Sequence, residues 1–253
     1  MAERARVLRM SRAVAGILIG SMTVLAACSL AACSGHRAAS VSHAPAPGNR
    51  SRAPIERASG GVHPLQEYTA AQILRKVKAA MASVTSIRVS GRVSGVVFDS
   101  FLKPPCEFAG TFHRGPAAIR VIRLGNTVYL QADAAFVRRL GMPARLAGRW
   151  VQTRADNGVV AGVAPRQLTG CFRDFSKFWA GLPTQGARKA GERTVRGQPA
   201  IELLDPQNDA AYVAATGQPY LLAFAFQGGD YVNFSSFNAP VTIAAPAKPA
   251  GTL

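Results

Sequence analysis

Acidic residues are scarce in this sequence of 253 residues: 13 Asp and Glu stand against 30 Lys and Arg, which gives a formal net charge of +17. The few carboxylates are scattered, so no pair is placed for general acid–base chemistry. A charge of this sign bears on partners and solubility rather than on the fold, and nucleic acid, anionic lipid or an anionic wall polymer would each suit it. The alternative is that arginine is simply abundant in a proteome rich in Ala, Gly, Arg and Pro.

The motifs of common catalytic and metal sites are missing as well. The chain has no Walker loop, no dinucleotide-binding glycine motif and no nucleophile elbow. Ser100 and Lys103 match Ser-x-x-Lys, but the accompanying Ser-Asp-Asn and Lys-Thr-Gly motifs are absent, so an envelope hydrolase is only a minor hypothesis. His113 falls on the polar face of a predicted strand, and no His or Cys pair has the spacing of metal ligands. We expect a non-enzymatic protein without metal or cofactor.

Charge is also absent from residues 13–27, "AVAGILIGSMTVLAA", which follow arginines at positions 4, 6, 9 and 12. A basic start, a short apolar run and small residues before a cysteine are typical of a bacterial lipoprotein signal. Leu-Ala-Ala-Cys occurs twice, ending at Cys28 and at Cys33. We favour Cys33 as the acylated residue, because Cys28 then leaves with a signal of residues 1–32 and a polar segment begins at once. Cys28, which gives the more usual apolar length, is the alternative.

The N-terminal pattern divides the chain and places it in the cell. Residues 33–64 are rich in Ser, Ala, Pro and Gly and predict a flexible tether, residues 65–246 a single folded domain, and residues 247–253 a disordered tail. An uncleaved transmembrane anchor at residues 13–35 is the alternative to a signal, and either one leaves the body outside the cytoplasm. We therefore expect a protein on the outer face of the cytoplasmic membrane. Export excludes nucleic acid and makes an anionic membrane surface the fitting partner of the basic body.

Hydrophobic periodicity predicts the elements of the domain. Thr69 and Gln72 form a capping-box pattern ahead of an apolar stripe of helical spacing, which predicts a helix from residue 70. The period then switches to two, and residues 87–97 predict one long strand whose apolar face carries Gly95 and Val97. Further strands are predicted at 106–113, 117–124, 127–132, 148–153, 187–195, 199–205, 210–216, 220–226 and 231–237, and helices at 133–141 and 173–182. Short gaps favour antiparallel hairpins in one α+β domain of about nine to eleven strands, whose long sheet should curl.

Several pieces of the domain occur in a familiar order: "AAQILRKVKAAMASVTSIRVSGRV", "VYLQADAAFVRRLG", "GQPAIELLD" and "YVAATGQPYLLAFAF". Together with the lipoprotein signal, they resemble actinobacterial envelope lipoproteins of the LppX/LprG type, within the LolA/LolB-like superfamily. The resemblance implies a strongly curved antiparallel sheet, a half-barrel, with helices packed on its concave side. It also implies a cavity that holds acyl chains of lipids or glycolipids in some members, although no motif marks the lipid contacts.

Apolar strand faces supply the candidates for lining such a cavity. The candidates are Val89, Gly91, Val93, Gly95, Phe108, Phe112, Phe224 and Phe226. The same residues would equally form an ordinary core, so a trough and a filled core stay alternatives. Glycine inside a strand marks a bend or the close approach of another group.

Arginines and cysteines complete the list of candidate sites. Anionic headgroups or a membrane surface are the candidate contacts of Arg88, Arg92, Arg120 and Arg123, with a solvated face as the alternative. Cys106 and Cys171 lie in the exported body, where an oxidising compartment and an even count favour a disulfide over two separate thiols.

Two functions follow from these patterns. The first is a monomeric, membrane-anchored carrier or chaperone of lipid or glycolipid. The second is a non-enzymatic module that binds or senses another envelope protein, which would have a packed interior and an exposed apolar patch.

Overall fold

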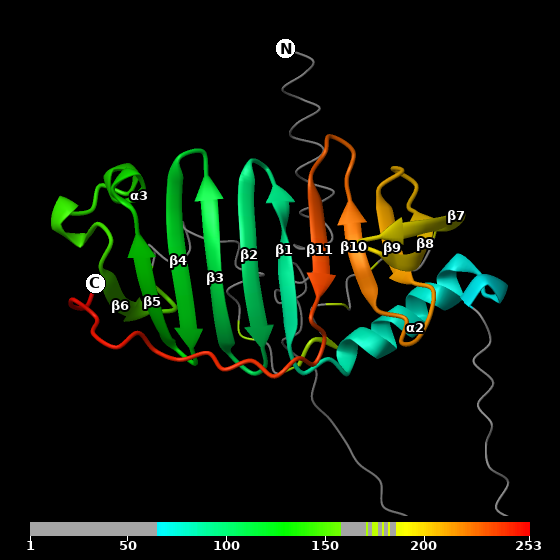
Figure 1. Cartoon of the computed structure of the whole chain (residues 1–253), viewed down its shortest axis with the longest axis horizontal. Coiled ribbons are helices and arrows are strands. Elements are labelled where there is room, and N and C mark those ends of the chain that lie inside the picture. Colours follow the sequence, from blue (N-terminus) through cyan, green and yellow to red (C-terminus); the bar gives the residue numbers. More distant parts are fainter. Residues whose placement is uncertain (1–64, 158–170, 172–173, 177–178, 180–181, 183–185) are drawn as a thin grey trace, which may run out of the picture.

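The computed structural model describes residues 65–157, 171, 174–176, 179, 182 and 186–253. These residues form one antiparallel sheet of eleven strands in the order β6-β5-β4-β3-β2-β1-β11-β10-β9-β8-β7. The sheet is unclosed and curved, and its β7–β9 end turns away from the rest (Figure 1). The strands are β1 (Ile87–Val93), β2 (Val96–Lys103), β3 (Glu107–Arg114), β4 (Ala117–Leu124), β5 (Thr127–Ala132), β6 (Trp150–Arg154), β7 (Arg188–Val195), β8 (Gln198–Leu204), β9 (Ala210–Ala214), β10 (Leu221–Ala225) and β11 (Tyr231–Ser235). The predicted half-barrel is confirmed.

Two runs of sequential hairpins make up the sheet. Neighbouring strands from β1 to β6 pair in chain order, and so do those from β7 to β11. The pairing of β1 with β11 joins the runs, with Val89 opposite Phe234 and Arg92 opposite Tyr231. That single non-local pairing therefore decides the whole architecture.

Helix α2 (Ala70–Ala82) forms as its sequence predicts. The Thr69 side chain accepts from the Gln72 backbone, and the Gln72 side chain accepts from the Thr69 backbone, which completes the capping box. Ile73, Val77 and Met81 are fully buried along one stripe. This stripe joins the same hydrophobic core as the apolar positions of the strands, so α2 covers the inner face of the sheet. Short α3 (Ala134–Arg139) and the one-turn helices η1 (Leu65–Glu67) and η2 (Ala144–Leu146) complete the described helices.

The predicted strand over residues 87–97 is wrong, because a tight turn divides it. Ser94 (φ 51°) and Gly95 (φ 75°) form a two-residue turn, and Val93 pairs with Val96. Two consecutive residues of positive φ suit the twist of a hairpin, and Gly95 adopts that conformation without steric cost. In β1 the odd-numbered side chains point into the core, whereas after this turn the even-numbered ones do. Strand β2 therefore buries Phe98, and Val97 and Gly95 are exposed. Gly95 therefore does not share the buried face.

Gly91 marks a close approach, as glycine within a strand suggests. A Cβ atom at this position would lie 2.2 Å from the Tyr231 carbonyl oxygen and 3.0 Å from the Val232 Cα atom. Both atoms belong to the backbone of β11, which cannot move aside as a side chain can. Only glycine lets β11 approach β1 this closely.

The two edges of the sheet are protected differently. Edge strand β7 is almost fully exposed and carries charged residues of both signs, such as Lys189 and Glu192, which discourage pairing with another chain. At the other edge, the chain's own C-terminus pairs with β6: the backbone N–H of Gln152 donates to the Gly251 oxygen (2.9 Å), and the N–H of Leu253 donates to the Gln152 oxygen (2.8 Å). These hydrogen bonds involve the last residues of the segment 247–253 that the sequence predicts as a tail.

The disulfide between Cys106 and Cys171 is present and confirms that prediction. Ser176 and Trp179 are helical, but the bounds of the helix predicted at residues 173–182 fall partly outside the described residues. Also outside them lie the predicted signal, both anchor cysteines and the tether. Within the described part of the chain, no helix has the length and hydrophobicity needed to cross a membrane.

Candidate functional site

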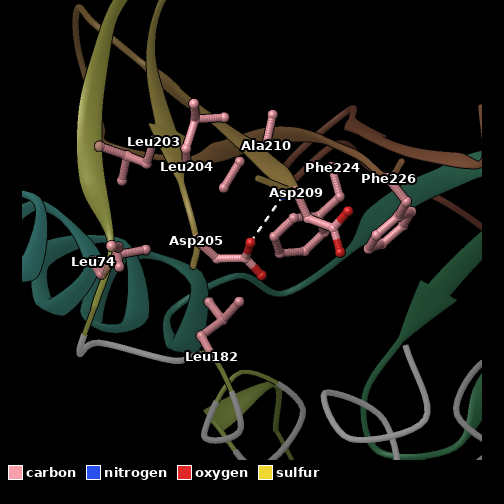
Figure 2. A pocket seen from close by; sticks show the side chains of 11 residues that line it. Leu74, Leu182, Leu203, Leu204, Asp205, Asp209, Ala210, Phe224 and Phe226 are labelled. Atoms are coloured by element: carbon pink, nitrogen blue, oxygen red, sulfur yellow. Dashed lines mark hydrogen bonds between the residues drawn. The ribbon is translucent and has the colours of Figure 1, made fainter. Parts of the chain in front are cut away.

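A small apolar pocket lies between α2 and the inner face of strands β8, β9 and β10 (Figure 2). Leu203, Ala211 and Phe224 are cross-strand neighbours, so they form its floor on three successive strands. Leu74 of α2 and Leu182 approach from the other side (Figure 2). The complete lining is Leu74, Leu182, Ala187, Leu203, Leu204, Asp205, Asp209, Ala210, Ala211, Phe224 and Phe226.

The pocket is narrow and its walls are aromatic and aliphatic. Its volume is about 30 Å³, far below the roughly 300–1,000 Å³ of typical ligand pockets. The Phe224 ring stacks on Phe226 at 6.0 Å and meets Phe234 edge-to-face at 5.8 Å. Phe224 and Phe226 are only half-buried, so the aromatic end of the pocket opens towards solvent. The arrangement offers an apolar group a sheltered slot with few directed polar contacts.

Two carboxylates at the rim hold turns together. Asp205 Oδ1 accepts hydrogen bonds from the backbone N–H groups of Gln207 (2.8 Å) and Asp209 (2.9 Å). Asp209 Oδ1 accepts from the backbone N–H of Gln227 at 2.9 Å, which joins the β8–β9 turn to the β10–β11 turn. Burial raises the pKa of Asp209, and the nearby Asp205 charge raises it further, although the bond from Gln227 opposes the shift. Both carboxylates are thus engaged in shaping the rim.

Of the predicted lining residues, the structure brings only Phe224 and Phe226 to this pocket. Val89, Phe108 and Phe112 are each about 1% exposed and belong to the hydrophobic core below β1–β5, where Phe112 also lines a pocket of about 60 Å³ beside α3. Two further candidates lie elsewhere: Gly91 is buried against β11, and Val93 is half-buried at the edge of the core.

Several pocket residues were missed by sequence reasoning. Leu74 lies beside the predicted stripe of α2, and its apolar character one position after Ile73 was the available signal of a wider buried face. Leu182 and Leu203 come from segments whose proximity only the tertiary fold creates.

The four predicted arginines do not form one cluster. Arg88, Arg92 and Arg120 lie on the outer face, over the rings of Phe101 (5.8 Å), Tyr231 (5.9 Å) and Trp150 (5.4 Å), respectively. Arg123 lies three residues after Arg120 on β4, so its side chain points to the opposite face of the sheet. Its Nε donates to the Gly125 oxygen at 2.8 Å, and burial lowers its pKa.

Arg88 is already paired on the outer face. Its Nε donates to Asp99 Oδ1 at 2.8 Å, and the second guanidinium nitrogen donates to Oδ2. This bidentate bond raises the pKa of Arg88 and lowers that of Asp99. Arg88 is therefore less available to an anion than Arg92.

The Ser-x-x-Lys match does not form a catalytic pair. Ser100 is 1% exposed on the inner face and donates to the Val89 carbonyl oxygen at 3.1 Å. Lys103 is three residues further along β2, so its side chain points to the opposite face, and its Nζ lies 3.0 Å from Glu107 Oε2. Across the described residues, no group of three or more His, Cys, Asp or Glu could hold a metal ion.

A larger groove of about 390 Å³ lies near the β7–β8 turn, away from the apolar pocket. Tyr220 and Phe237 stack at 4.3 Å in its wall, and Arg196, Gln198 and Gln218 give it a mixed, polar lining. Such a lining suits an acyl chain less well than the apolar pocket does.

No family model matches the chain, and no curated protein sequence matches it either. Among solved structures, it is similar to LprF from Mycobacterium bovis at 15% identity and a TM-score of 0.49, over 73% of this chain and 99% of that one. Mycobacterium tuberculosis lipoprotein LppX matches at 15% identity and a TM-score of 0.43, over 69% and 98%. The Pseudomonas aeruginosa MucA/MucB complex gives 16% identity and a TM-score of 0.30, over 71% and 59%.

Proposed function

We propose that this protein is a membrane-anchored, extracytoplasmic lipoprotein that binds acyl chains as a carrier or chaperone of envelope lipids. The observation that carries the proposal is the apolar pocket between α2 and the inner sheet face, which opens at the half-buried rings of Phe224 and Phe226. The signal-like N-terminus supplies the location, with Cys33 as the proposed anchor. No polar recognition group is needed, because burial itself drives the binding of an acyl chain.

The dimensions of the pocket set how such binding proceeds. A cavity of about 30 Å³ receives only the first apolar group, so a longer chain must displace Leu74 or Leu182 from the sheet. Exposing one leucine costs about 1.5–3 kcal/mol, whereas each buried methylene gains about 0.8 kcal/mol. Roughly two to four buried methylenes therefore offset the opening of the pocket. We expect long acyl chains to bind and chains shorter than this to fail.

The test measures lipid that copurifies with the full chain, expressed with its own signal in an actinobacterial host. Solvent extraction separates non-covalent lipid from the covalent anchor, and mass spectrometry quantifies each. Ala211→Phe should fill the pocket floor and lower the extracted lipid at least severalfold. The matched control is Ala118→Phe, on the face of β4 opposite to buried Ile119, and should retain wild-type levels. Lipid-free wild-type protein, or equal lipid in both variants, would contradict the proposal.

Intact mass of the purified lipoprotein tests the proposed anchor. A mature chain that begins at Cys28 carries five more residues, 28–32, than one that begins at Cys33. The two masses are readily resolved. A mature protein that starts at Cys28 would overturn our choice of cysteine while leaving the lipid proposal intact.

A second candidate function is a non-enzymatic module that binds another envelope protein. The small volume of the apolar pocket favours it, because a packed interior leaves little room for a lipid. In-cell crosslinking followed by purification should then recover one stoichiometric protein and no extractable lipid. Recovery of lipid without a stoichiometric protein would exclude this candidate.

A further inference from the structure

Two exposed apolar residues lie on the outer face of the sheet, on strands β2 and β11 to either side of β1. Val97 is 46% exposed and Tyr231 is 40% exposed; with Leu253 at 40%, they are the exposed large hydrophobic residues of the described chain. Arg92 is the cross-strand partner of both Val97 and Tyr231. Val97, Arg92 and Tyr231 thus form one row across β2, β1 and β11, which we name the outer-face triplet.

The charge at the centre of this row is held in place without being neutralised. Arg92 lies 5.9 Å from the centre of the Tyr231 ring, and its guanidinium donates to the Gly229 carbonyl oxygen at 2.9 Å. Among the described residues it forms no ion pair, in contrast to Arg88. Asp230, the nearest acid in sequence, accepts the backbone N–H of Ser94 at 2.9 Å. The triplet therefore presents a positive charge between two apolar side chains.

The triplet and the apolar pocket share one hairpin end. Phe226 lines the pocket, and its backbone N–H donates to the Asp230 oxygen at 2.9 Å, directly before Tyr231. Figure 1 shows the β10–β11 turn at the same edge of the sheet as the β1–β2 and β3–β4 turns. Arg114 at the end of β3 pairs with Val96 and adds a second exposed cation to this edge. A surface that met the triplet would consequently lie close to the open end of the pocket.

We propose that the outer-face triplet docks this edge of the sheet on an anionic membrane surface. Val97 and Tyr231 enter the headgroup region and Arg92 contacts lipid phosphate. This inference rests on the proposed function, because docking brings Phe226 and the pocket to the source of acyl chains. Arginine near an anionic leaflet gains about 1 kcal/mol, and tyrosine suits the interface because its ring is apolar and its hydroxyl is polar.

The observations favour a membrane over a protein partner. A stable protein interface buries about 800 Å² on each side, far more than two side chains provide. A tethered domain needs only weak contacts, because anchoring holds it at high effective concentration near the bilayer. The formal net charge, +17 for the whole sequence and +14 once the four Arg and one Glu of residues 1–32 are removed, also complements an anionic leaflet.

The test places a tryptophan in the triplet and measures its contact with acyl chains. Val97→Trp full-length lipoprotein is reconstituted into phosphatidylglycerol vesicles whose acyl chains carry bromine, which quenches nearby tryptophan. Leu253→Trp is the matched control, because Leu253 is equally exposed but lies at the distant C-terminus. The wild type supplies the background of its 2 native tryptophans. We expect at least twofold stronger quenching for Val97→Trp than for Leu253→Trp, and a loss of this difference when Arg92→Glu is added.

The outcomes separate docking from lipid carriage. Equal quenching at Val97 and Leu253, or quenching that Arg92→Glu leaves unchanged, would overturn the docking proposal. A stoichiometric protein crosslinked at position 97 would overturn it in favour of a protein interface. If Val97→Trp is not quenched but lipid still copurifies, the docking proposal fails and the proposed function stands. If Val97→Trp is quenched but no lipid copurifies, the docking proposal stands and the proposed function fails. Each variant should have the Tm of the wild type, because the substituted residues are exposed, and this equality verifies that the fold is intact.

Discussion

The Cys106–Cys171 disulfide should be a major source of stability, because it closes a long loop. The two residues are 65 positions apart, and the bond ties the segment before β3 to a segment beyond β6. In the chain-entropy model, closing a loop of this length lowers the conformational entropy of the unfolded chain and so raises the free energy of unfolding by about 4 kcal/mol. For a domain of this size, about 1 kcal/mol corresponds to 2–4 °C in Tm. Replacing both cysteines by serine should therefore lower Tm by about 8–16 °C.

The assay is thermal unfolding of the full-length lipoprotein in one detergent, followed by intrinsic fluorescence with and without reductant. Reductant should lower the Tm of the wild type to that of the double variant and leave the double variant unchanged. A fall of less than about 3 °C in the double variant, roughly 1 kcal/mol on this scale, would refute the reasoning. It would mean that the unfolded chain gains little freedom when the loop opens, or that the two residues are not bonded in the mature protein.

Three further predictions concern stability and are checked by the same unfolding measurement. Gly91→Ala should lower the free energy of unfolding by about 3 kcal/mol, because the added Cβ would lie 2.2 Å from the Tyr231 carbonyl oxygen. An unchanged Tm would show that β1 and β11 can separate freely. The raised pKa of Asp209 means that the folded state favours the protonated, neutral carboxyl. Asp209→Asn should therefore be more stable than the wild type at neutral pH and equally stable well below pH 4. A difference in stability that persists in acid would contradict this cause. Asp133→Ala should cost about 2 kcal/mol, since one carboxylate accepts the N–H groups of Phe136 and Ala118, both at 2.7 Å; exposed Asp156→Ala is the control that should leave Tm unchanged.

Local patterns predicted the elements well because the interactions behind them span few residues. The capping box of Thr69 and Gln72 needs only one helical turn, and period-two alternation marks each strand separately. The β1–β2 turn was missed because Ser94 and Gly95 continue the period-two alternation, although a Ser-Gly pair is itself a signal for a turn. The separation of Arg120 and Arg123, by three residues on one strand, was a signal in the sequence that they face opposite sides.

The candidate site was harder to predict, because its residues meet only through non-local pairing. Leu74 comes from the first long helix, Leu203 from β8 and Phe224 from β10, and no pattern within one segment states that they share a pocket. Phe224 and Phe226 were found because apolar alternation marks them. Phe108 and Phe112 have the same alternation but are buried in the core away from this pocket. Alternation assigns a residue to a face, and the neighbours that cover that face decide whether a cavity remains.

The sequence by itself determined the basic charge, the capped helix, the antiparallel hairpins and the pair of cysteines that bond. Each rests on composition or on contacts between near neighbours. The tertiary structure decided that β1 pairs with β11, that the C-terminus covers the edge of β6 and that Val97, Arg92 and Tyr231 form one row. These features depend on which distant strands approach each other. That choice is made by the free energy of the whole packed core, to which every segment contributes and which no single segment encodes.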